Sequence, residues 1–180
     1  KTSVTWQWTA LEQAAFDMIK AMLASAPVLR APDWERPFRL HTDWSAKGTG
    51  CALTQIDPAT NEEYVVSYGS RVNTDTQSHY AAYKGEVEAA LWAIERMRYY
   101  LYGRRFTLIT DCMAIKWLTT SATLKNELAR WSLRMANFDF DVVHRPGVTN
   151  PVDFFSRHPT EQLMPREGLA AIHDPLVRIQ

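Results

Sequence analysis

The chain has 180 residues, of which 46% are hydrophobic and 22% charged, so it can bury one substantial core. Its formal net charge is zero, which argues against tight autonomous binding to nucleic acid through the phosphates. No apolar run is long enough to span a bilayer, and Cys51 and Cys112 are isolated thiols without metal-ligand or disulfide spacing. We therefore expect no membrane association and a reducing compartment.

The first predicted element is a helix over residues 9–24. Thr9, followed three residues later by Glu12, is typical of a helix start, and apolar residues recur behind it at helical spacing. The helix should end before Pro27, and residues 31–37 indicate a linker and a domain boundary near residue 35. Because the chain begins with Lys and enters this amphipathic segment almost at once, we expect it to be a piece of a longer polypeptide.

Three strand-like runs follow, separated by turn-forming residues, and predict an antiparallel meander over 38–45, 48–57 and 62–72. The remaining predicted elements are a long helix to about residue 101, a strand at 106–110, helices at 113–118 and 123–137, a strand at 138–144 and a short final helix. Long crossover connections make the last two strands parallel to the first. The predicted fold class is α/β, a five-stranded mixed sheet with three antiparallel strands and then two parallel ones, flanked by helices.

Two acids are predicted to converge at the centre of this sheet. Asp43 lies late in the first strand and Asp111 directly follows the fourth, and these strands are neighbours in the predicted topology. Ligands of open sheets with crossover helices favour the region outside the carboxyl ends of the strands. Each acid alone could equally cap a turn or a helix, but together they indicate the beginning of a metal site.

The long helix offers a choice between Glu86 and Glu88. The apolar stripe of the helix centres roughly 70° from Glu86 and roughly 130° from Glu88. Glu86 should therefore face the sheet, while Glu88 should be solvated. The small residues that would let the helix approach the sheet closely are Ala82, Ala90 and Ala93.

A fourth acid, Asp153, follows Pro151 in the predicted final helix, which should return to the same end of the sheet. Four separated carboxylates suit two Mg²⁺ ions, because hard cations prefer oxygen ligands, and Mn²⁺ should substitute. Clustered cations indicate either a local basic face or solvated helix surfaces. These cations are Arg96, Arg98, Arg104 and Arg105, with Lys116, Lys125, Arg130 and Arg134 further along the chain.

Several long motifs in order resemble one family. HTDWSAKGTGCALTQ, GEVEAALWAIERMRYYLYGRRFTLITDCMAIKWL and LARWSLRMANFDFDVVHRPGVTNPVDFFSR are similar to the ribonuclease H domain of gypsy-type long-terminal-repeat retrotransposon Pol polyproteins. WTALEQAAFDMIKAMLASAPVLRAPDWERPF resembles the end of the reverse transcriptase that precedes this domain. By this resemblance, residues 1–35 end the reverse transcriptase or connect it, residues 36–158 form the ribonuclease H domain, and residues 159–180 are a tail or linker.

The resemblance implies endonucleolytic hydrolysis of the RNA strand of RNA–DNA hybrids by a two-metal mechanism during reverse transcription. The implied partners are the hybrid and the attached polymerase, and the implied location is a cytoplasmic retroelement particle. The metal-binding and catalytic residues that carry over are Asp43, Glu86, Asp111 and Asp153, in agreement with the choice of Glu86 from helix geometry. Candidate contacts to substrate or departing product are His144, Arg145 and Arg130.

The sequence departs from the family pattern near these acids. Trp44 follows the first acid where a small residue is usual, and Cys112 replaces a common His. Tyr83, Lys84 and Gly85 stand where a threonine and charged residues are typical. Because side chains alternate along a strand, Trp44 should point away from the face that carries Asp43.

One alternative from another functional class remains open, a degenerate or domesticated domain that acts as a non-catalytic scaffold or interaction module. The presence of all four acids favours the nuclease. An integrase-type or resolvase-type nuclease is disfavoured because such sites use a different spacing of acids. The sequence does not indicate an oligomeric state.

Overall fold

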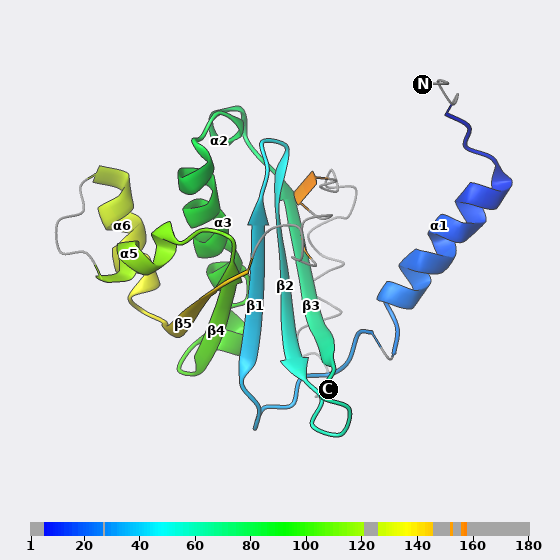
Figure 1. Ribbon diagram of the computed structural model, residues 1–180, viewed down its shortest axis with the longest axis horizontal. Coiled ribbons are helices and arrows are strands. Elements are labelled where there is room, and N and C mark those ends of the chain that lie inside the picture. The colour runs from blue at the N-terminus through cyan, green and yellow to red at the C-terminus, as the bar shows by residue number, and fades with distance from the viewer. Residues whose placement is uncertain (1–5, 27, 121–125, 146–151, 153–155, 158–180) are drawn as a thin grey trace, which may run out of the picture.

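The computed structural model describes residues 6–26, 28–120, 126–145, 152 and 156–157, and its centre is a single five-stranded sheet (Figure 1). The strands are β1 (Phe38–Trp44), β2 (Gly48–Ile56), β3 (Glu63–Val72), β4 (Arg105–Thr110) and β5 (Asp139–His144). The helices are α1 (Ala10–Leu23), α2 (Asp75–Ser78), α3 (Ala82–Arg96), α4 (Arg98–Leu101), α5 (Ala114–Thr120) and α6 (Asn126–Met135).

The sheet has the strand order β3-β2-β1-β4-β5, so that β1 lies in the middle. β1 pairs antiparallel with β2, and β2 pairs antiparallel with β3. β4 runs parallel to β1, with Leu40 opposite Leu108, and β5 runs parallel to β4. This confirms the predicted mixed sheet, in which helical crossovers return the chain to the starting edge of each parallel strand.

Polar residues close the two turns of the meander. Between β1 and β2, the Ser45 hydroxyl accepts hydrogen bonds of 3.2 Å from the N–H groups of Lys47 and Gly48. Between β2 and β3, Asn61 adopts a φ of 57°, a left-handed conformation that Asn tolerates better than most residues. The N–H of Asn61 also donates to the carbonyl of Asp57 at 2.7 Å. The turn-forming residues seen in the sequence therefore make these turns.

The helix α3 packs along β1 through small side chains. The predicted apolar stripe of α3 and its continuation is buried, as shown by Val87, Ala90, Leu91, Ile94, Met97 and Leu101. One prediction is wrong: Ala82 is exposed, because it is the first residue of the helix and its neighbours there are exposed as well. The alanines of α3 that are fully buried are Ala89, Ala90 and Ala93.

Helix ends differ modestly from the sequence expectations. The long helix predicted to residue 101 is divided at Met97 into α3 and α4, although the apolar stripe continues across the break. α5 starts one residue later and ends two residues later than predicted, and α6 lies within the predicted range. Of the predicted final helix, Ser156 and Arg157 are described and helical. Such shifts are expected because helix ends fray and periodicity fixes only the interior.

Residues 28–36 connect α1 to β1 and lie against the sheet. The N–H of Val65 donates to the carbonyl of Val28 at 3.0 Å, and the N–H of Arg30 donates to the carbonyl of Val65 at 2.9 Å. The fully buried Gln55 holds the same segment, since its amide accepts from the N–H of Asp33 and donates to the carbonyl of Asp33. The domain boundary near residue 35 stays a prediction.

The helix α1 begins with the predicted capping box of Thr9 and Glu12. None of its residues is buried, and it lies away from the sheet (Figure 1). Several of its large apolar side chains, including Leu11, Met18 and Ile19, are more than half exposed. Among the described residues, no helix is both long and apolar enough to cross a membrane.

We predict that Gln55→Met lowers the free energy of unfolding by about 1–3 kcal/mol, because it removes the hydrogen bonds that the buried Gln55 amide makes to the partly buried backbone of residues 33 and 36. Trypsin should then cleave faster within residues 28–36. Urea denaturation and limited proteolysis measure the two effects. Gln13→Met, on the exposed surface of α1, is the matched control and should change neither. An unchanged urea midpoint for Gln55→Met would show that these bonds do not anchor the segment.

Candidate metal centre

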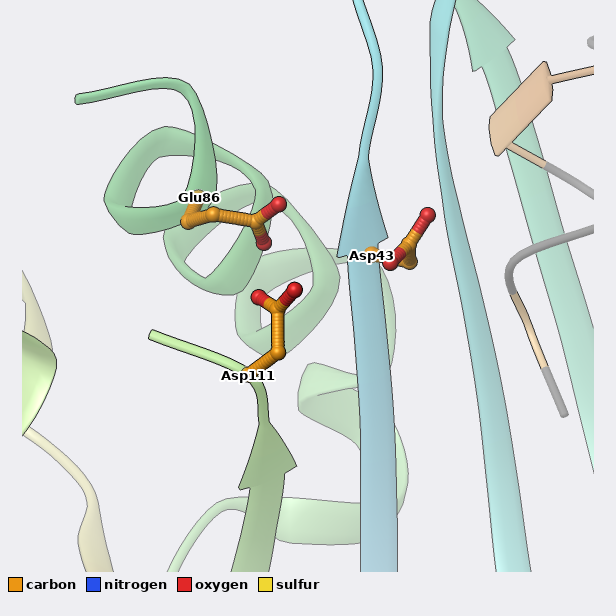
Figure 2. A group of neighbouring side chains, drawn as sticks. All are labelled: Asp43, Glu86 and Asp111. Atoms are coloured by element: carbon orange, nitrogen blue, oxygen red, sulfur yellow. The ribbon is translucent and has the colours of Figure 1, made fainter. Parts of the chain in front are cut away.

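Three predicted acids meet at one end of the central strands. Asp43 lies near the end of β1, Asp111 directly follows β4, and Glu86 projects from α3. One carboxylate oxygen from each residue lies within 4.8 Å of the others. Figure 2 shows the carboxylates of Glu86 and Asp111 pointing toward each other, with Asp43 beside them on β1. The convergence follows from the parallel pairing of β1 with β4, which brings their carboxyl ends side by side.

Glu86 is a buried carboxylate with a hydrogen-bond partner for only one of its two oxygens. Its side chain is 7% exposed, and its Oε1 accepts a hydrogen bond of 3.2 Å from the N–H of Trp44. Its Oε2 is buried and has no hydrogen-bond partner among the described residues. A buried carboxylate oxygen without a donor is costly unless a cation or a proton satisfies it.

Burial and charge both act on this group. Burial raises the pKa of Glu86 to about 9, and the neighbouring carboxylates of Asp111 and Asp43 add to the effect. The hydrogen bond from the Trp44 N–H acts in the opposite direction but is the smaller influence. Without a cation, Glu86 is therefore protonated at neutral pH.

The prediction that Glu86 rather than Glu88 faces the other acids is confirmed, but the predicted solvation of Glu88 is wrong. The Glu88 side chain is only 14% exposed and forms an ion pair with Arg71 of β3. It also accepts a hydrogen bond of 3.1 Å from Gln77. The helix turns Glu88 away from the metal centre and toward β3, where it meets Arg71. The helical pattern alone could not predict this pairing, because Arg71 belongs to another element.

A serine from the C-terminal segment holds the carboxylate of Asp43. Asp43 is 3% exposed and accepts a hydrogen bond from the hydroxyl of Ser156. The hydroxyl of Ser45 in turn donates to the carbonyl of Ser156 at 2.6 Å. Ser156 was not among the predicted site residues, although it follows Asp153 by three residues, about one helical turn, and this spacing pointed to it. Asp153 itself lies outside the described residues.

Two of the three predicted substrate contacts lie at the same end of the sheet as the acids, and the third lies elsewhere. His144 ends β5 opposite Thr110, and the N–H of Arg145 donates to the carbonyl of Thr110 at 2.9 Å. Because Thr110 immediately precedes Asp111, the backbone of both residues reaches the same end of the sheet as the acids. Arg130 instead lies exposed on α6, and no described contact links it to the acids. The roles proposed for all three residues stay predictions.

The three departures from the family pattern also find places near the acids. Trp44 packs against the start of α3 at Gly85 while Asp43 reaches Ser156, so these side chains leave β1 in opposite directions, as predicted. Cys112 is buried, and burial raises the pKa of its thiol. Both cysteines are free thiols.

Comparison with known proteins places this geometry in a family. The family described as RNase H-like domain found in reverse transcriptase matches residues 8–108. The Pol polyprotein of transposon 297 from Drosophila melanogaster is 32% identical over 149 residues, which cover 82% of this chain and 14% of that protein. The Tf2-3 transposon polyprotein of Schizosaccharomyces pombe is 33% identical over 162 residues, covering 87% and 12%. The chain thus spans about a seventh of these relatives.

Solved structures show the same fold. The foamy viral protease-reverse transcriptase in complex with RNA/DNA hybrid superposes with a TM-score of 0.55 at 14% identity, covering 77% of this chain and 19% of that one. The complex of the same kind of enzyme with double-stranded DNA also gives 0.55, at 16% identity, covering 81% and 30%. The resemblance to the ribonuclease H domain of retrotransposon polyproteins is confirmed, while the narrower gypsy-type assignment stays a prediction. The chain belongs to the RNase H-like domains found in reverse transcriptase.

Proposed function

We propose that this domain hydrolyses the RNA strand of RNA–DNA hybrids during reverse transcription, with Mg²⁺ held by its carboxylates. The observation that carries the proposal is the group of three carboxylate oxygens within 4.8 Å of one another, together with the buried and unpartnered Oε2 of Glu86. Crowded carboxylates with an unsatisfied buried oxygen form the donor set that a hard divalent cation requires. Membership of the family supports the nuclease over a scaffold that would have no need of such a site.

Rigid elements hold the acids of the proposed metal centre in place. Asp43 lies in β1 and Asp111 directly follows the adjacent β4, so the sheet fixes their spacing, and the packing of α3 on β1 fixes Glu86. Asp153 is proposed to complete the set from the predicted final helix. When bound, two divalent ions would activate the attacking water and stabilise the leaving oxygen of the phosphodiester. The carboxylates would hold the ions and thereby orient the reacting groups, and a rigid arrangement suits this role because it needs no rearrangement during the reaction.

The substrate follows from the family and from the electrostatics of the chain. Relatives are Pol polyproteins, and a structural neighbour is a reverse transcriptase in complex with RNA/DNA hybrid. Selectivity for the RNA strand would rest on its 2′-hydroxyl groups and the shape of the hybrid, without reading base sequence. Because the net charge is zero, we propose that the attached polymerase supplies much of the affinity. The proposed setting is the cytoplasmic particle of a retroelement.

His144 and Arg145 are proposed to meet the substrate or the departing product. Their backbone lies beside the strand that ends at Asp111, and Arg145 would present a guanidinium to a phosphate near the reacting group. Arg130, on α6, would contact the hybrid farther from the acids.

We predict that Asp111→Asn abolishes cleavage of a labelled RNA–DNA hybrid in Mg²⁺, by a factor on the order of 10³ or more, because it removes a charge that holds the cations. Circular dichroism should show an unchanged fold. Glu88→Gln is the matched control on α3 and should cleave nearly as well as the parent, with a small loss of stability from the broken pair with Arg71. Full activity of Asp111→Asn would mean that this acid does not hold the cations, whereas a parent chain that cleaves no hybrid would favour the scaffold function.

We predict that Glu86→Gln is more stable than the parent in EDTA, and that the difference grows between pH 5 and pH 9. The folded parent keeps the Glu86 proton up to a pKa of about 9, whereas the unfolded chain loses it near the ordinary value of 4.5. The folded state therefore binds more protons in this window, so its stability falls as pH rises, by at most about 1.4 kcal/mol per pH unit.

Thermal melts across this pH range, with and without millimolar Mg²⁺, measure the effect. Mg²⁺ should stabilise the parent more than Glu86→Gln at pH 8, because binding to the folded state alone raises its melting temperature. A parent more stable than Glu86→Gln in EDTA at pH 8, and indifferent to Mg²⁺, would mean that the acids do not form a metal centre.

A further inference from the structure

Trp44 and Gly85 touch where the end of β1 meets the first turn of α3. A Cβ atom placed on Gly85 would lie 2.8 Å from Cε3 of the Trp44 indole, and closer still to Cδ2 and Cε2. Carbon atoms essentially never approach so closely without a bond, so any side chain at position 85 has to displace the indole or the helix. The atoms in conflict belong to a rigid double ring whose Nε1 is buried, so no flexible end can give way.

Each of these residues is the chain neighbour of a metal-centre acid. Trp44 follows Asp43, and Gly85 precedes Glu86. The N–H of Trp44 also donates to Oε1 of Glu86, so one residue provides both the packing surface and the hydrogen bond. The approach of α3 to β1 at this end therefore fixes where the Glu86 carboxylate lies relative to the other acids.

We infer that Trp44 and Gly85 are a size-matched pair that positions Glu86 for metal binding, although neither is a ligand. The inference rests on the proposed function. It accounts for two departures from the family pattern with one contact, because a large residue after the first acid fits only where the facing helix residue has no side chain.

Helix propensity and the contact with Trp44 predict opposite changes in melting temperature for Gly85→Ala, so the sign of the change tests the inference. In an ordinary helix interior, Gly→Ala is stabilising, because glycine is among the poorest helix formers. At Gly85 the contact with Trp44 demands the reverse. Gly85→Ala should therefore lower the melting temperature in EDTA and disturb Glu86 at the same time.

The experiment measures Mn²⁺ affinity and melting temperature for the 180-residue chain and its variants. Free Mn²⁺ is followed by its electron paramagnetic resonance signal during titration. Gly85→Ala and Trp44→Ala should each raise the Kd for Mn²⁺ by about tenfold or more, in the range typical of residues that orient metal ligands. The double variant Trp44→Ala/Gly85→Ala should bind Mn²⁺ more tightly than Gly85→Ala alone, because removal of the indole makes room for the methyl group. Trp44→Phe should lie nearer the parent than Trp44→Ala.

Trp92→Ala is the matched control. Trp92 lies on the same helix but packs against Gly69 and Arg71 of β3, so its loss should lower the melting temperature and leave Mn²⁺ affinity unchanged. If Gly85→Ala does not fold, recovery of folding in the double variant supports the pair, and failure of both variants to fold overturns it.

Asp111→Asn separates this inference from the proposed function. If Asp111→Asn binds Mn²⁺ as the parent does, the metal centre itself is wrong, and the positioning role falls with it. If Asp111→Asn loses binding while Gly85→Ala binds like the parent, only the pairing is overturned. The pairing would also be overturned if the double variant bound Mn²⁺ no more tightly than Gly85→Ala.

Discussion

The parallel pairing of β1 with β4 is the constraint on which the rest of this domain depends. It places the carboxyl ends of two central strands side by side, and thereby brings Asp43 and Asp111 together from distant parts of the chain. Parallel pairing requires a long crossover, and the helix that supplies it, α3, then has to lie close on β1. The fully buried alanines of α3 permit this approach, which is how Glu86 reaches the two strand acids.

Without a bound cation, the crowded carboxylates of the site destabilise the folded domain. Glu88 of α3 is paired with Arg71, whereas Glu86 of the same helix lies buried beside two carboxylates with one oxygen unsatisfied. Burial and like charge together raise its pKa, so the metal-free site resists ionisation. A cation would remove the cost, and such strained groupings of acids are typical of functional sites rather than structural ones.

Uncharged neighbours pack around the acids on both sides of β1. Trp44 is accommodated because Gly85 presents no side chain, and Ser156 binds the carboxylate of Asp43 from the other side. These contacts join strand, helix and C-terminal segment around the acids. The geometry of the centre is thus set by a shell of uncharged neighbours as much as by the acids themselves.

The sequence by itself determined the order of the elements, the mixed sheet and the choice of Glu86, because the alternation of strands and the period of helices are local properties. The convergence of the strand acids followed from topology, since crossover length leaves few alternatives. Only the tertiary structure decided that Glu88 finds Arg71, that Trp44 rests on Gly85, and that the backbone of residues 28–36 is held by a buried amide. Each of these contacts joins different elements, and its existence depends on the spacing and angle at which those elements pack, which the periodicity of neither element encodes.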